Sequence, residues 1–104
     1  MHDDILNLIK MVKLKPGLYV GRKSLVKLRS FLDGYVFAMR YNNIKYNSVQ
    51  YNMFNDWIAS KYNIRTSELW DTYLPRITNN EEKAFDLFFE ELEEFLKKHT
   101  NENL

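Results

Sequence analysis

The sequence contains no cysteine, and only two histidines, two prolines and three glycines occur among its 104 residues. Without cysteine the chain has no disulfide framework, no thiolate zinc site and no iron–sulfur ligand set. His2 and His99 lie near opposite ends, so we predict neither a metal site nor a bound cofactor. No apolar run approaches the roughly 20 residues that span a membrane, and Asp3 and Asp4 stand where a signal peptide is basic. We expect a cytoplasmic protein without a membrane anchor.

The remaining composition is typical of one folded domain with an aromatic core. Hydrophobic residues make up 45% of the chain, aromatic residues 15% and charged residues 28%, which is the usage of a globular protein. We expect residues 1–104 to form a single domain, with 100–104 as a flexible tail. Most aromatic residues fall on apolar stripes, which favours core packing over stacking on nucleic-acid bases.

The net charge of +1 conceals two halves of opposite charge. Residues 1–50 hold nine Lys or Arg against three Asp or Glu, for a net charge of +6, and residues 51–104 hold six against eleven, for −5. Such a chain can fold its basic half against its acidic half, or it can present one charged face to an oppositely charged partner. The sequence leaves both open, and we favour the first.

The spacing of apolar residues is helical almost throughout and predicts an all-α fold, a compact single-domain bundle of four to five helices. Pro16 and Gly17 indicate a loop over 15–23, and Asn42 indicates a second break, after which a short strand over 44–47 is an open alternative. The first predicted helix covers 4–13, the second runs from the cap Ser24 to the break at Asn42 and Asn43, and the third covers about 48–63. A short fourth helix is capped by Thr66 or Ser67 and stops before Pro75. The last helix begins with a capping box at Thr78 and runs to about His99.

The second predicted helix has the broadest apolar face, which predicts a central position in the bundle. Gly34 in its middle costs up to about 1 kcal/mol relative to alanine. We therefore expect another helix or an aromatic ring to pack closely against Gly34, which would make Gly34→Leu more destabilising than helix propensity predicts.

The last predicted helix carries a row of acidic residues opposite its apolar face. Such a row attracts Lys- and Arg-rich protein surfaces and accelerates their encounter, although a solvated helix face has the same pattern. The row lacks the histidine three residues after an inward glutamate that is typical of carboxylate metal sites in bundles. The candidate partner-binding residues are Asp86, Glu90, Glu91, Glu93 and Glu94.

The segment 15–24 is the most distinctive in the chain, because two glycines and a proline frame apolar residues just before a helix. It is either a plain loop that places these residues in the core or a site where helix N–H groups and basic side chains hold an anion. The candidate anion-binding residues are Lys15, Arg22 and Lys23.

Several segments together resemble a group of small bacterial proteins, some of which are immunity proteins of toxin–immunity systems similar to those of contact-dependent growth inhibition. The resemblance spans nearly the whole chain and includes a Trp-containing middle. The segments that carry it are Pro16-Gly17-Leu18-Tyr19-Val20-Gly21, Ser24-Leu25, Phe31-Leu32-x-Gly34-Tyr35 and Lys83-Ala84-Phe85-Asp86-Leu87-Phe88.

The resemblance implies a binding protein that neutralises one cognate toxin, often a nuclease, by docking on its surface. The residues themselves predict no enzyme, because the chain has no cysteine nucleophile and no serine in a nucleophile-elbow pattern. The alternative is a small nucleic-acid-binding or regulatory module that uses the basic first half, although no helix-turn-helix pair is evident and the whole domain is near neutral. Neither hypothesis fixes an oligomeric state.

Overall fold

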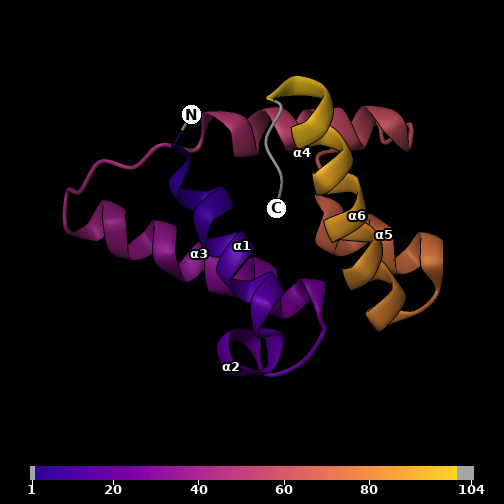
Figure 1. Ribbon diagram of the computed structural model, residues 1–104, viewed down its shortest axis with the longest axis horizontal. Helices are drawn as coiled ribbons and strands as arrows, with labels where there is room; N and C mark the ends of the chain where they lie inside the picture. Colours follow the sequence, from indigo (N-terminus) through magenta and orange to yellow (C-terminus); the bar gives the residue numbers. More distant parts are fainter. Residues whose placement is uncertain (1, 101–104) are drawn as a thin grey trace.

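The computed structural model describes residues 2–100, which form six helices and no strand (Figure 1). The all-α fold is confirmed, with one helix more than the predicted range. Thr100 is the C-cap of the last helix, and the rest of the predicted tail, 101–104, lies outside the described residues. The helices are α1 (Asp4–Leu14), α2 (Pro16–Val20), α3 (Leu25–Tyr41), α4 (Val49–Lys61), α5 (Trp70–Thr78) and α6 (Glu81–His99).

Small polar residues set several helix ends where the sequence predicts them. Ser24 Oγ accepts a hydrogen bond from the backbone N–H of Lys27 at 3.2 Å and caps α3. Asn43 follows α3 and Asn63 follows α4 with positive φ values of 56° and 57°, the left-handed conformation that asparagine tolerates better than most residues. The predicted ends of these two helices are therefore confirmed.

The prediction of a plain loop over 15–23 is wrong, because this segment contains α2. Pro16 occupies the first turn of α2, where its missing N–H leaves no hydrogen bond unmade and its fixed φ suits a helix. Gly21 ends the helix with a φ of 85°. The same two residue types that indicate a loop thus begin and end a short helix here.

The predicted boundaries of α5 and α6 also need correction. α5 begins after Leu69 rather than at a Thr66 or Ser67 cap, and it contains Pro75 instead of stopping before it. Thr78 is the last residue of α5, and the N-cap of α6 is Asn80.

The core is centred on α6, which packs against α5, α4 and α3. The ring of Phe88 lies 4.4 Å from that of Trp70 and 5.5 Å from that of Phe54, between centroids. Phe95 extends this cluster along α6, with its centroid 5.6 Å from that of Phe54. The expectation that aromatic residues build the core is confirmed for these side chains, which are all buried.

Only the first half of α3 is part of this core. Leu25, Leu28 and Leu32 are buried, whereas the rest of the helix extends past α1, away from α5 and α6 (Figure 1). The prediction of a central helix therefore holds for half of its length. The predicted close contact at Gly34 is wrong, since a Cβ atom built there meets no atom within 4 Å.

Gly34→Ala is expected to raise the free energy of unfolding by up to about 1 kcal/mol. The added methyl group meets open space, and alanine loses less backbone entropy on folding than glycine does. Urea denaturation of both proteins measures the difference, and a destabilised variant would contradict the open environment of this residue.

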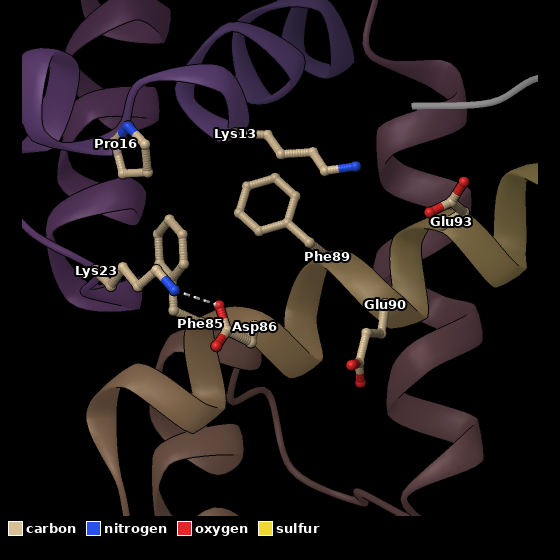
Figure 2. A pocket seen from close by; sticks show the side chains of 8 residues that line it. All are labelled: Lys13, Pro16, Lys23, Phe85, Asp86, Phe89, Glu90 and Glu93. Atoms are coloured by element: carbon tan, nitrogen blue, oxygen red, sulfur yellow. Dashed lines mark hydrogen bonds and ion pairs between the residues drawn. The ribbon is translucent and has the colours of Figure 1, made fainter.

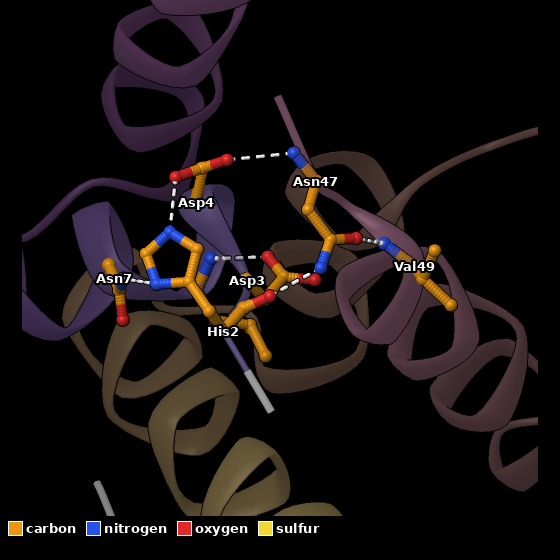
Figure 3. Close-up of polar contacts among 7 residues, drawn as sticks. His2, Asp3, Asp4, Asn7, Asn47 and Val49 are labelled. Carbon is orange, nitrogen blue, oxygen red and sulfur yellow. Dashed lines mark hydrogen bonds and ion pairs between the residues drawn. The ribbon is translucent and has the colours of Figure 1, made fainter. Parts of the chain in front are cut away.

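Hydrogen bonds of Asp3 and Asp4 join the start of α1 to the first turn of α4 and to the segment before it, and Figure 3 shows the bond between Asp4 and Asn47. The Asp3 carboxylate accepts the N–H of Leu6 at 2.9 Å through one oxygen and the N–H of Tyr51 at 3.0 Å through the other. Beside it, Asp4 accepts the N–H of Asn47 at 2.7 Å, and this hydrogen bond lowers the pKa of Asp4. One end of the chain thereby fixes the connection between α3 and α4.

Among residues 2–100, three ion pairs join the basic half of the sequence to the acidic half. Their nitrogen–oxygen distances are 3.3, 3.0 and 2.9 Å, and they are Arg22–Glu81, Lys23–Asp86 and Arg29–Asp71. Part of the charge asymmetry is therefore satisfied within the fold.

Candidate protein-binding surface

The predicted acidic row lies on α6, and local chemistry fixes the start of this helix. Asn80 Oδ1 accepts the backbone N–H of Lys83 at 2.8 Å and caps the first turn. Acidic residues in the first turn and basic residues in the last turn both suit the helix dipole. The helix buries its Phe- and Leu-rich side, which leaves its carboxylates at the margins of that side and on the outer face.

The five candidate acidic residues do not form one surface. Glu91 and Glu94 lie beside α4, where both bind Lys61. The other three line a cavity next to α1 and α2, and we call them the acidic edge: Asp86, Glu90 and Glu93.

Lys61 forms a compact cluster with the first pair of carboxylates. Its Nζ donates hydrogen bonds to Glu91 at 2.8 Å and to Glu94 at 2.6 Å, and it lies 5.3 Å from the ring centroid of Trp57. These hydrogen bonds raise the pKa of Lys61, and the bond from Lys61 lowers the pKa of Glu94. Glu91 is only 6% exposed and connects α6 to α4 within the fold, whereas the Glu94 side chain is 39% exposed and shares the same lysine at the surface.

A cavity of about 300 Å³ separates the acidic edge from the corner between α1 and α2 (Figure 2). At one end Lys23 Nζ donates to Asp86 at 3.0 Å. Glu93 Oε1 forms an ion pair with Lys97 Nζ at 3.7 Å. Glu90, in contrast, is exposed and forms no ion pair with any residue of the described range 2–100. The lining residues are Lys13, Pro16, Lys23, Phe85, Asp86, Phe89, Glu90 and Glu93.

The chemistry of this cavity is that of a binding surface with an aromatic floor and a charged rim. Phe85 and Phe89 project toward it from α6, and Lys13 and Pro16 face them from the other side (Figure 2). Such a hollow can take an apolar side chain of a partner, while the exposed carboxylate of Glu90 can meet a basic group beside it.

The structure does not bring the three candidate anion-binding residues together. Each lines a different hollow of the surface. Arg22 binds Glu81 and Lys23 binds Asp86, so carboxylates of the chain already neutralise both cations. Lys15 is exposed at the end of α1.

Sequence reasoning missed Lys13, Pro16, Phe85 and Phe89 as residues of the cavity. Helical periodicity assigns the two phenylalanines to the core, and they are indeed largely buried. Lys13 and Pro16 are some seventy residues away in sequence, and no local signal indicates that the fold places them opposite α6.

No family model, curated protein or solved structure matches the chain. Within residues 2–100, no group of three or more histidines and carboxylates is placed to hold a metal ion. Over the same residues, no helix is both long enough and apolar enough to cross a membrane.

Proposed function

We propose that this chain is a cytoplasmic binding protein of the immunity type, which neutralises a cognate bacterial toxin by docking the acidic edge and its cavity on a basic surface of the toxin. The partner we favour is a nuclease, whose substrate-binding surface must be basic to hold nucleic acid. Covering that surface would block the toxin without any catalytic step by this chain.

The observation that carries the proposal is the position of Glu90. Its carboxylate is exposed and without an ion pair in the described part of the chain, and it lies beside a cavity with a largely buried aromatic floor. Exposed charge accelerates encounter at low salt, and a pocket beside it provides room for an anchoring side chain. The resemblance to immunity proteins supports the same role.

The basic half is less suited to nucleic acid than its net charge of +6 indicates. Arg22, Lys23 and Arg29 each bind a carboxylate of the acidic half. Phosphate binding by these residues would first have to break those ion pairs. We therefore do not propose the nucleic-acid-binding alternative as the function.

Glu90→Lys is expected to slow association with the toxin about 3- to 10-fold at low salt, because it reverses the exposed charge beside the cavity. The binding partner in this experiment is the purified product of the neighbouring gene, and stopped-flow fluorescence measures the association rate at low and high salt. Asp56→Lys is the matched control, since Asp56 is also an exposed helical carboxylate without an ion pair in the described range but lies outside the acidic edge.

Two results would contradict the proposal. The first is failure of the two wild-type proteins to form a stoichiometric complex at any salt concentration. The second is an equal change of the association rate in Glu90→Lys and Asp56→Lys, because only the overall charge would then matter.

A further inference from the structure

The second half of α3 exposes an aromatic face that no described part of the chain covers. Phe37 is 68% exposed and Tyr41 is 77% exposed, and no residue of α3 after Leu32 is buried. The two rings stack on each other, with centroids 6.0 Å apart and planes inclined by 23°. Intramolecular packing thus leaves two large rings in water, where each loses the free energy of burial that core aromatics gain.

The surface around these rings is open and leaves room for another helix. An open groove of about 500 Å³ runs along this part of α3 and is lined by Asp33, Val36, Phe37, Arg40 and Tyr41. Beside the rings, Gly34 has open space where a Cβ atom would be, so a second backbone can approach closely.

The charges along this groove complement a second copy of the same surface. Asp33 and Arg40 lie seven residues apart, about 10 Å along the helix, on either side of Phe37. When two copies of α3 run antiparallel about a two-fold axis near Phe37, Asp33 of each copy lies opposite Arg40 of the other. Arg40 forms no ion pair within the described residues. The one ion pair of Asp33 in that range is an exposed contact with Arg29, with a nitrogen–oxygen distance of 3.3 Å.

We propose that the chain forms a symmetric dimer through this groove, with Phe37 of both copies at the centre and two Asp33–Arg40 pairs at its ends. In such a symmetric contact both copies use the same surface. Asp33 of one copy therefore meets Arg40 of the other at each end. The contact covers only two to three helical turns, so the interface is small and the dimer dissociates on dilution. The proposal is independent of toxin binding, which uses the opposite flank of the molecule along α6.

Sedimentation velocity over a protein concentration range from about 1 μM to 1 mM tests the dimer. We expect the wild-type sedimentation coefficient to rise with concentration. Phe37→Asp should raise the dissociation constant by at least about 30-fold, the effect of a central interface residue. Val26→Asp is the matched control, because Val26 is an exposed apolar residue of α3 outside the groove, and it should leave the dissociation constant unchanged.

A charge swap tests the antiparallel geometry. Asp33→Arg alone and Arg40→Asp alone each place like charges opposite each other, and each should weaken self-association about tenfold. An equimolar mixture of these two variants restores opposite charges at both ends, so we expect a heterodimer as stable as the wild-type dimer. Circular dichroism verifies that every variant remains helical.

Three results would overturn the proposal. A wild-type protein that stays monomeric at every concentration excludes the dimer. A dimer that is insensitive to Phe37→Asp uses another surface. If the protein is monomeric and Phe37→Asp instead abolishes binding of the neighbouring gene's product, the aromatic face belongs to that partner. The Glu90→Lys variant should dimerise normally, which separates a failure of this proposal from a failure of the proposed function.

Discussion

Asp3→Ala is expected to lower the free energy of unfolding by about 3 kcal/mol, because one buried carboxylate caps two helices. Asp3 is 2% exposed, and its two oxygens accept N–H groups from the first turns of α1 and α4. The side chain of Ser48, at the N-cap of α4, accepts no backbone N–H of that helix. Alanine would leave both N–H groups unpaired at a buried site and would remove a negative charge from two positive helix ends.

Urea denaturation followed by circular dichroism measures this loss. Asp3→Asn should recover part of the stability, since the amide oxygen still accepts one of the two hydrogen bonds. Asn7→Ala is the control, because Asn7 is exposed on the same helix and should change stability by no more than about 0.5 kcal/mol. A loss for Asp3→Ala as small as that of the control would show that this carboxylate does not hold α1 and α4 together.

The capping of two helices by Asp3 also shows what sequence patterns miss in this fold. In the sequence, Asp3 indicates only the start of its own helix. The spacing of apolar residues does not predict that Asp3 also accepts the N–H of Tyr51, which lies 48 positions later. The same limit applies to α3, whose apolar stripe is continuous although only its first half meets other helices. Local rules succeed where the cause is local, as at the Ser24 cap and at the left-handed Asn43 and Asn63.

The predicted acidic row shows a similar division. Glu90 and Glu91 are adjacent and chemically equal in the sequence, yet one is exposed at the acidic edge and the other is buried against Lys61. The side of α6 on which each carboxylate lies follows from helical geometry, but whether that side is covered depends on where α4 packs. Sequence reasoning therefore found the acidic residues and could not separate those that hold the fold from those that face outward.

Lys61→Met is expected to lower the free energy of unfolding by about 2 kcal/mol at neutral pH, because it leaves the buried carboxylate of Glu91 without its cation. The expected loss of stability is smaller than for a fully buried ion pair, since the Lys61 side chain is 39% exposed and water can partly replace it. Methionine has an unbranched side chain of similar length, so the change removes the charge, including its contact with the Trp57 ring, and keeps most of the side-chain volume.

The pH dependence of this loss distinguishes charge from packing. In the wild type, Lys61 lowers the pKa of Glu94, so this contact stabilises the fold above the ordinary carboxyl pKa of about 4.3 and is lost as the pH falls through the lowered value. In the variant that contribution is absent. The difference in stability should therefore be largest at neutral pH and shrink between about pH 5 and pH 3. Because the pKa of Lys61 is raised, the difference should persist at alkaline pH up to the ordinary lysine value of about 10.4.

Lys98→Met provides the matched control for this measurement. Lys98 contacts Glu94 at 3.3 Å from an exposed position on the same helix, so its removal should cost no more than about 0.5 kcal/mol. Glu91→Gln in the Lys61→Met background should recover much of the loss, since the amide carries no charge to leave unpaired. A loss for Lys61→Met that stays constant from pH 3 to pH 7 would assign the effect to packing and would contradict a buried ion pair between α4 and α6.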